Sequence, residues 1–346
     1  MSIIYFILVL GITVSIHEFG HFVFAKRAGV HVYEFSIGMG PKLLKFNRKN
    51  DETEYYIRLF PIGGYVSMAG EDMEEDNKIP KDKQLCNKGW FDRFLTLIAG
   101  IAFNFLLAII LLFVVGLIKG CPNSKPIIGY IDENYPIAAT NLKVNDEIIK
   151  INDHKVGSTE ELVLYLTVNS GENLDFTVIH ENGKKETINV KPILTEKDGE
   201  EGYSYGFALD SSKTYGILNS IKYAFVQTKN LVIQMALIIF YLITGQLGLD
   251  NLSGPIGIFT IVGTAAEAGI ASILYLIAYL CINVGFINFI PFPAFDGGRI
   301  LFLIIEKIKG SRVNPKIENI IHTIGFFLLM ILMIFVTYQD ILRLFN

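Results

Sequence analysis

Long apolar runs alternate with polar stretches along this chain of 346 residues. A membrane-spanning helix needs about 20 mostly apolar residues. Four stretches meet that requirement: Ser2 to Ala25, Phe94 to Ile118, Ile270 to about Ile290, and Ile320 to Val336. A fifth, Leu231 to Ile243, is 13 residues long, which is short for a span, so we expect an interfacial or buried helix there. The pattern predicts an α-helical integral membrane protein with about four transmembrane helices.

Two of the polar stretches alternate in the manner of β-strands. In the first, KLLKF and TEYYIRLF flank the polar turn NRKNDE, which predicts a β-hairpin around Lys42 to Phe60. The acidic run Glu71 to Asp76 is expected to be a solvated loop. The second contains four strand-like runs with a helix between the second and third, and Asn182-Gly183 is typical of a hairpin turn. This order predicts a small inserted α+β domain with Ile148 and Ile151 in its core.

Basic residues near the span ends predict the orientation of the chain. Lys26 and Arg27 follow the first span, and Arg299 begins a basic loop between the third and fourth. These loops are expected to be cytoplasmic, so the N-terminus, the inserted domain and the C-terminus are expected to face outward. The predicted segments are 1–25 (span one), 26–92 (cytoplasmic loop with the hairpin), 93–118 (span two), 119–205 (inserted domain), 206–269 (interfacial helix and connection), 270–298 (span three) and 299–346 (loop and span four).

Composition agrees with a membrane protein and narrows its function. The chain is 51% hydrophobic with mean hydropathy +0.42. Its net charge of −4 does not suggest the excess of positive charge that is typical of nucleic-acid-binding proteins. Its three cysteines have no spacing typical of a disulfide framework. The first apolar run lacks a basic region before it and a cleavage site after it, so we expect it to be retained rather than removed as a signal peptide.

Two histidines and a glutamate interrupt the first apolar run, as His17-Glu18-Phe19-Gly20-His21. Residues four apart share one face of a helix, so one metal ion can bind both imidazoles, with Glu18 beside them as a general base. A charged residue in the middle of a membrane costs about 2.5–3.5 kcal/mol on the lenient scale, which favours a functional interpretation. The alternative is that these polar side chains only pack between helices.

Catalytic zinc sites usually have three protein ligands and an open position for water. His31 and His322 are possible third ligands, but Asp296 in NFIPFPAFDGG is the better candidate. Asp296 follows the third span at its cytoplasmic end, and HEFGH lies near the cytoplasmic end of the first span. Pro291 and Pro293 break the helix before Asp296. The alternative for Asp296 is an ordinary turn residue before two glycines.

These motifs resemble those of the site-2 protease family of intramembrane zinc metalloproteases, particularly its bacterial branch that regulates sigma factors and carries one PDZ domain. HEFGH and NFIPFPAFDG are the most specific motifs. The stretches GMGPKLLKF with TEYYIRLFPIGGYV, GIAFNF and NLSGPIGI are similar to the family's membrane-associated β-hairpin, second-span and pre-third-span motifs. PIAATNLKVNDEIIKIND resembles a PDZ domain, with Asn145 where that family usually has glycine. Another small β-rich domain is the alternative.

The resemblance implies a zinc metalloendopeptidase in the bacterial inner membrane that carries out regulated intramembrane proteolysis. It implies Zn²⁺ held by His17, His21 and Asp296, with Glu18 as the base and the active site near the cytoplasmic side. The implied substrates are single-span membrane proteins, such as anti-sigma factors or remnant signal peptides, in contact with membrane lipid.

Four further residues are candidate substrate contacts, each with an ordinary structural alternative. Asn288 can bind peptide groups freed when a substrate helix unwinds, or it can cap a helix end. Asn104 can contact substrate or form an interhelical hydrogen bond. Gly63 and Gly64 allow close backbone approach or simply form a turn. The hairpin at Lys42 to Phe60 can offer an edge strand to an extended substrate, or be a structural loop.

Two other classes of protein compete with a protease. A membrane scaffold that has lost catalysis would bind partners only through the inserted domain, although all four catalytic positions are present. A metal transporter would use His17, His21 and Asp296 to line a path, but spans one and two offer almost no further polar residues. The sequence therefore favours the protease.

Overall fold

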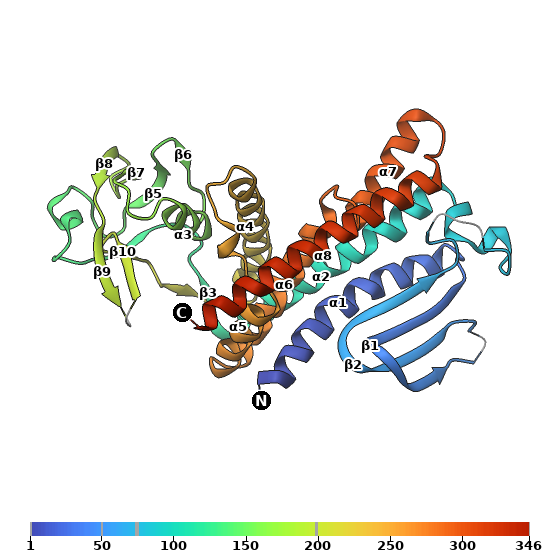
Figure 1. The fold of residues 1–346 in the computed structure, drawn as a ribbon. Coiled ribbons are helices and arrows are strands. Elements are labelled where there is room, and N and C mark those ends of the chain that lie inside the picture. Colours follow the sequence, from blue (N-terminus) through green and yellow to red (C-terminus); the bar gives the residue numbers. More distant parts are fainter. Residues whose placement is uncertain (1, 50, 73–75, 198–199, 346) are drawn as a thin grey trace. The chain divides into compact units, whose positions relative to one another are not determined.

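The computed structural model describes residues 2–49, 51–72, 76–197 and 200–345 (Figure 1). The chain divides into two compact units. We call Met1–Val115 together with Leu249–Asn346 the helical unit, and Gly116–Gly248 the inserted unit. The inserted unit extends well beyond the expected boundary at residue 205.

The helical unit contains the four predicted spans and two helices that the sequence did not reveal. Its helices are α1 (Ser2–Arg27), α2 (Trp90–Lys119, which continues into the inserted unit), α5 (Pro255–Glu267), α6 (Ile270–Phe289), α7 (Asp296–Lys309) and α8 (Pro315–Phe345). α1, α2, α6 and α8 are each long and apolar enough to cross a membrane. The expected loop after the third span instead begins with α7, an amphipathic helix that ends at Gly310 in the left-handed conformation.

Contacts between side chains show which way these helices run. Thr13 in the middle of α1 lies against Cys281 in the middle of α6, and the two helices end near the motifs HEFGH and FDGG. α2 and α8 run the opposite way, since Thr96 and His322, near their starts, lie beside those motifs. The four helices therefore alternate in direction, as expected for successive membrane crossings.

The predicted hairpin is confirmed, and it is more elaborate than expected. β1 (Val32–Asn47) and β2 (Glu54–Met68) each bend near the middle, at Gly38–Gly40 and after Phe60. Segment 54–58 is paired on both sides, with 42–47 on one side and with 34–37 on the other. Segment 34–37 also pairs with 64–68 on its other side. The result is a four-segment antiparallel sheet whose two edges are 42–47 and 64–68.

The loop after this sheet was expected to be a solvated acidic run. Residues 73–75 of that run lie outside the described part of the chain, but its ends have partners. Glu71 forms an ion pair with Arg299, and Asp76 accepts a hydrogen bond from Tyr33. The loop continues through two short 3₁₀ turns, η1 (Lys81–Lys83) and η2 (Leu85–Asn87), into α2.

The inserted unit has the predicted order of strands and helix. Its elements are β3 (Cys121–Pro122), β4 (Ile128–Ile131), η3 (Pro136–Ala139), β5 (Glu147–Ile151), β6 (His154–Lys155), α3 (Thr159–Val168), β7 (Leu174–Ile179), β8 (Lys185–Val190), β9 (Ile193–Lys197), β10 (Glu200–Ser204), β11 (Phe207–Leu209) and β12 (Lys213–Thr214). A four-stranded sheet has the order β6-β5-β7-β8, and β4 pairs with β11. Ile148 and Ile151 are both fully buried, because a bulge between Ile148 and Lys150 shifts the register of β5.

The expected helix at Leu231 to Ile243 is longer in the structure than the sequence predicted. This segment is the second half of α4 (Ile217–Ile243), a 27-residue helix that is also long and apolar enough to span a membrane. Its first half was missed because it contains polar residues. Two of them, Gln227 and Asn230, are buried and hydrogen-bonded to Glu160 of α3, so the polar face packs within the inserted unit.

Candidate metal centre

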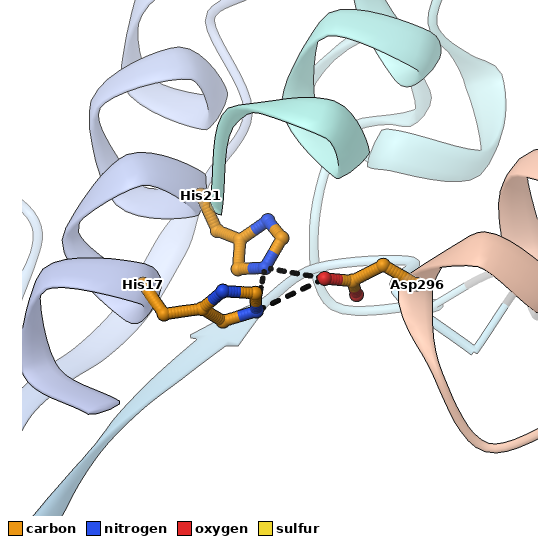
Figure 2. A group of neighbouring side chains, drawn as sticks. All are labelled: His17, His21 and Asp296. Carbon is orange, nitrogen blue, oxygen red and sulfur yellow. Dashed lines mark hydrogen bonds and ion pairs between the residues drawn. The ribbon is translucent and has the colours of Figure 1, made fainter. Parts of the chain in front are cut away.

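Three side chains from opposite ends of the chain converge in the helical unit (Figure 2). His17 and His21 lie one turn apart on α1, and Asp296 is the first residue of α7. Nε2 of His17 and Nε2 of His21 are 3.1 Å apart. Oδ2 of Asp296 lies 3.0 Å from the first and 3.3 Å from the second. Three potential ligand atoms thus face one another across a very small space.

The chemistry of this group fits a divalent cation. Nδ1 of His21 lies 2.7 Å from the carbonyl oxygen of Thr96, so it donates there and leaves a lone pair on Nε2. Oδ2 of Asp296 is buried, and no hydrogen-bond donor reaches it from the described part of the chain. Lone pairs held this close repel one another unless a cation lies among them. Zinc bonds of about 2.0–2.1 Å in a tetrahedron separate ligand atoms by roughly 3.3–3.4 Å, close to the spacing seen here.

Asn104 contacts His17 of α1, which favours the interhelical hydrogen bond, one of its two expected roles, over the substrate contact. Its side chain is completely buried, and its amide lies 3.3 Å from Nδ1 of His17. With the Nε2 lone pair directed at a metal, Nδ1 carries the proton and needs an acceptor. Oδ1 of Asn104 is buried and has no partner within the described ranges, and turning the amide by 180° supplies that acceptor. Asn104 thus orients the His17 ring.

Gly100 is a second residue of GIAFNF that serves the histidine pair, and sequence reasoning missed it. A Cβ atom on Gly100 would lie 2.4 Å from Nε2 of His21 and 2.9 Å from Cε1 of His17. One on Gly20 would lie 2.4 Å from the carbonyl oxygen of Ala99. Glycine therefore lets α2 pass close enough to α1 for the rings to be held between them. The i, i+4 spacing of Gly100 and Asn104 was the available signal.

The loop before Asp296 breaks the helix as the prolines predicted. α6 ends at Phe289, and α7 starts at Asp296. A Cβ atom on Gly297 would lie 2.2 Å from the carbonyl oxygen of Ile290, and one on Gly298 2.5 Å from that of Phe292. The two glycines are therefore needed because α7 folds tightly back onto the loop, which is more than an ordinary turn requires.

An open pocket of about 560 Å³ surrounds the three ligands. Glu18 and Asn288 line it, as expected for a base and a substrate contact. Val66 and Met68, from edge segment 64–68 of the sheet, also line it, and neither was anticipated. Arg299 and Glu71, paired at 3.2 Å, form part of the wall. The pocket is large enough for a short extended peptide to approach the ligands and Glu18 together.

Gly63 and Gly64 have internal contacts that account for them. Both are buried, and Ser15 of α1 donates a hydrogen bond to the carbonyl oxygen of Gly63. A Cβ atom on Gly64 would lie 3.0 Å from the Cα of Ser15 and 3.3 Å from Cγ of Glu18. These glycines therefore bring the sheet against α1 beside Glu18, and they do not line the pocket.

The two other histidines considered as third ligands lie outside the cluster. His31 forms an ion pair with Glu52 at 3.1 Å. Nearby, the Lys26 ammonium hydrogen-bonded to Asp51 lowers the pKa of that carboxyl group and so ties the hairpin turn to the end of α1. His322 contacts the loop before Asp296 and accepts a hydrogen bond from the backbone N–H of Ala294.

Comparison with known proteins agrees with this geometry. The model of peptidase family M50 matches residues 5–332. The zinc metalloprotease RasP of Geobacillus kaustophilus is 34% identical, with 99% of this chain and 98% of the relative covered. RasP of Oceanobacillus iheyensis and the regulator of sigma-W protease RasP of Bacillus subtilis are each 32% identical, with 99% of both chains covered. The resemblance noted in the sequence is confirmed: this chain belongs to peptidase family M50.

Proposed function

We propose that this protein is an intramembrane zinc metalloprotease that hydrolyses peptide bonds within the spanning segments of other membrane proteins. In this proposal His17, His21 and Asp296 hold the zinc ion. The observation that carries it is the convergence of three ligand atoms within 3.0–3.3 Å inside a unit of apolar helices. A site of this kind in such surroundings acts on substrates that are themselves in the membrane.

The proposed mechanism assigns a task to each residue of the pocket. Zinc bound there supplies Lewis acidity, which makes water a nucleophile near neutral pH and polarises the scissile carbonyl group. Glu18 accepts the proton of the attacking water and passes it to the leaving amine. Asn104 and the carbonyl oxygen of Thr96 keep the two imidazole rings in the orientation that leaves Nε2 free. No covalent acyl-enzyme is required.

A substrate helix hides its peptide groups in its own hydrogen bonds, so it must unwind before cleavage. We propose that the unwound stretch adds as a strand to the edge segment 64–68, because Val66 and Met68 line the pocket beside Glu18. This differs from the sequence-based expectation of Lys42 to Phe60, of which 54–58 is paired on both sides. Asn288 is proposed to bind peptide groups that the unwinding frees.

The direction of the helices supports a topology of four crossings. α2 ends and α6 begins at the ends opposite the zinc ligands, so the chain leaves and re-enters on the same side. If α4 also crossed the membrane, a further crossing before α6 would be needed to bring the chain back to the same side. The helix available for it, α5, has 13 residues and extends only about 20 Å, which is too short. We therefore propose that α4 lies at the membrane without a net crossing, that the ligands lie near the cytoplasmic side, and that the inserted unit is extracytoplasmic.

We propose that residues 119–205 of the inserted unit form a PDZ-like domain that restricts access to the membrane site. The strand order supports this, as does Asn145 at φ +75°, where the PDZ family usually has glycine. One relative is named as the regulator of sigma-W protease. By extension, anti-sigma factors whose outer domains have been removed are the proposed substrates, with remnant signal peptides as a second class.

Co-expression with a panel of single-span model substrates tests the proposal. We expect cleavage within the spanning segment by the wild-type protein, and none by Glu18→Gln or in the presence of a zinc chelator. A scaffold would retain its cellular function in Glu18→Gln. A transporter would move zinc into vesicles that contain the purified protein, and that result would overturn the assignment.

A further inference from the structure

Two residues on one face of α8 contact the loop that leads into Asp296. The backbone N–H of Ala294 donates to Nδ1 of His322 at 3.0 Å. One turn later, a Cβ atom on Gly325 would lie 2.5 Å from both the Cβ and the carbonyl oxygen of Pro293. α8 therefore holds the backbone two and three residues before the proposed zinc ligand, although it supplies no ligand itself.

The backbone held in this way is in an unfavourable conformation. Ala294 has φ +83°. In the described part of the chain, the other residues with positive φ, apart from glycine, are Asn145 and Asn152. Asparagine tolerates this conformation because its side chain can bond locally, whereas alanine has a Cβ atom and no such compensation. Something outside the loop must therefore hold Ala294 there.

The hydrogen bond defines what His322 can do. Because Nδ1 accepts from Ala294, the proton of the neutral ring lies on Nε2. That Nε2 atom is buried and has no hydrogen-bond partner among the residues that the structure describes. The ring thus serves as an acceptor for one backbone N–H and leaves its own donor unused, which is a costly arrangement for a residue that merely fills space.

We propose that His322 is a positioning residue for Asp296. Its hydrogen bond, together with the close contact at Gly325, keeps Pro293-Ala294 in the conformation that directs the carboxylate of Asp296 at the two histidines. This inference rests on the proposed role of Asp296 as a zinc ligand. It gives α8 a function in the metal site in addition to its place in the helical unit.

The test measures zinc affinity of the purified full-length protein in detergent, by competition with a chromophoric chelator, with circular dichroism as a check on folding. His322→Leu removes the acceptor, and we expect affinity to fall by about 10- to 100-fold, as for other residues that orient metal ligands. His322→Asn retains an acceptor near the position of Nδ1, and we expect it to recover most of that loss. Leu328→Ala, at an exposed position on α8, is the matched control and should bind like the wild type.

A double variant distinguishes positioning from a general effect on folding. In His322→Leu/Ala294→Gly, glycine adopts positive φ without cost, so we expect part of the lost affinity to return. Gly325→Ala tests the second contact if His322→Leu does not fold, and we expect weaker zinc binding with normal helix content. Unchanged affinity in His322→Leu or in Gly325→Ala would overturn the proposal, as would equal losses in His322→Leu and His322→Asn. A wild-type protein without zinc affinity would instead contradict the proposed function.

Discussion

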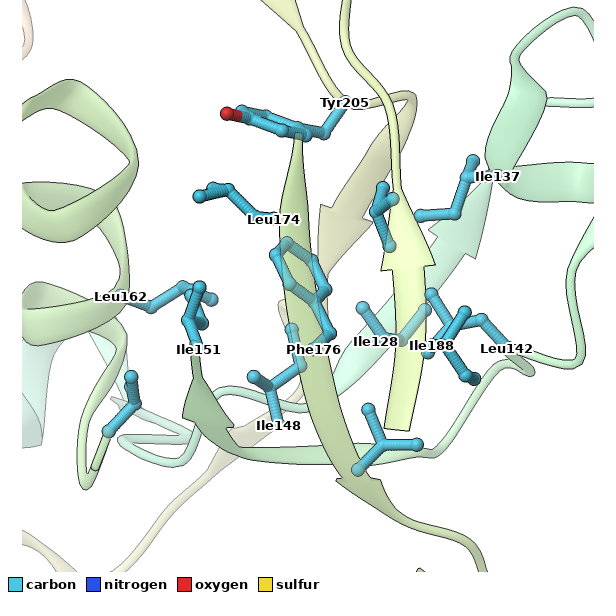
Figure 3. Packing of buried hydrophobic residues seen from close by; sticks show 13 residues of the cluster. Ile128, Ile137, Leu142, Ile148, Ile151, Leu162, Leu174, Phe176, Ile188 and Tyr205 are labelled. Atoms are coloured by element: carbon cyan, nitrogen blue, oxygen red, sulfur yellow. The ribbon is translucent and has the colours of Figure 1, made fainter. Parts of the chain in front are cut away.

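The core of the inserted unit and helix α1 of the helical unit differ in the side chains that they bury. In the inserted unit, apolar side chains form the interior, with Phe176, Leu174 and Ile128 completely buried (Figure 3). In the helical unit, α1 buries Thr13 and the two histidines, while Ile3, Ile4, Leu8 and Phe19 are exposed. Large apolar side chains thus fill the interior of the inserted unit, whereas several of those on α1 are exposed and its buried positions include polar side chains.

This difference follows from the surroundings of each unit. In water, burial of apolar surface drives folding, so the inserted unit builds its core from isoleucine, leucine and phenylalanine. Between helices in lipid that driving force is absent, and close packing of small residues with polar contacts takes its place. Gly20, Gly100 and Asn104 provide this in the helical unit. Some of the contacts that hold α1 and α2 together are therefore also contacts to the candidate metal ligands.

The largest effect is expected from a single added carbon in the helical unit. In Gly100→Ala, the new Cβ atom would meet Nε2 of His21 at 2.4 Å. We expect zinc binding and cleavage to be lost, because one ring must leave its position. Zinc content of the purified protein measures this directly. Gly263→Ala, whose Cβ atom would find only an ordinary contact at 3.6 Å, is the control. Normal zinc content in Gly100→Ala would contradict the close packing described.

A large cavity in the inserted unit should leave the metal site intact. Phe176→Ala removes a completely buried ring, and we expect the inserted unit to lose about 3–5 kcal/mol of stability. Limited proteolysis should show earlier digestion of residues 119–205, while zinc content stays at the wild-type level. Val163→Ala, at an exposed position on α3, should change neither. Loss of zinc together with the inserted unit would show that the units do not fold separately.

A buried carboxylate should stabilise the helical unit more than its exposed apolar residues do. Asp340 is 3% exposed and accepts hydrogen bonds from the backbone N–H groups of Gly254 and Gly257, at the start of α5. Asp340→Ala leaves both donors without partners, and we expect it to cost about 1–3 kcal/mol. Thermal denaturation in detergent measures the change, with Tyr338→Phe as control. An unchanged midpoint would refute the importance of this polar contact.

The smallest effect should come from an ion pair on the surface of the inserted unit. Nζ of Lys125 lies 2.7 Å from Glu147, but the lysine side chain is 58% exposed. Water and salt screen such pairs, so Lys125→Ala should change the stability of this unit by less than about 1 kcal/mol. Chemical denaturation followed at the inserted unit tests this. A larger loss would mean that polar contacts matter equally in both units.

Periodicity and spacing predicted the elements with strong local signals. Long apolar runs predicted α1, α2, α6 and α8, and the two β-rich regions followed from alternation and turn residues. α4 was underestimated because Gln227 and Asn230 made its first half appear too polar, whereas Glu160 satisfies both side chains. α7 was missed because its two initial glycines resemble a turn.

The sequence indicated the three candidate ligands that converge in the structure, but it did not indicate how the residues around them pack. The i, i+4 histidines and the aspartate after a broken helix indicated a metal by residue type alone. Gly100, Asn104 and His322 act across helix interfaces, and nothing in their local sequence indicates which side chain they meet. For Asn104 the sequence accordingly left both a substrate contact and an interhelical hydrogen bond open. Such roles require knowledge of how the helices pack.

The central claim is that His17, His21 and Asp296 hold one zinc ion beside Glu18. The most direct measurement is the zinc content of purified wild-type protein, Glu18→Gln and Asp296→Ala, determined by elemental analysis alongside cleavage of a single-span substrate. We predict equimolar zinc in the first two proteins, zinc loss in Asp296→Ala, and cleavage by the wild type alone. Full zinc content in Asp296→Ala, or cleavage by Glu18→Gln, would contradict this account.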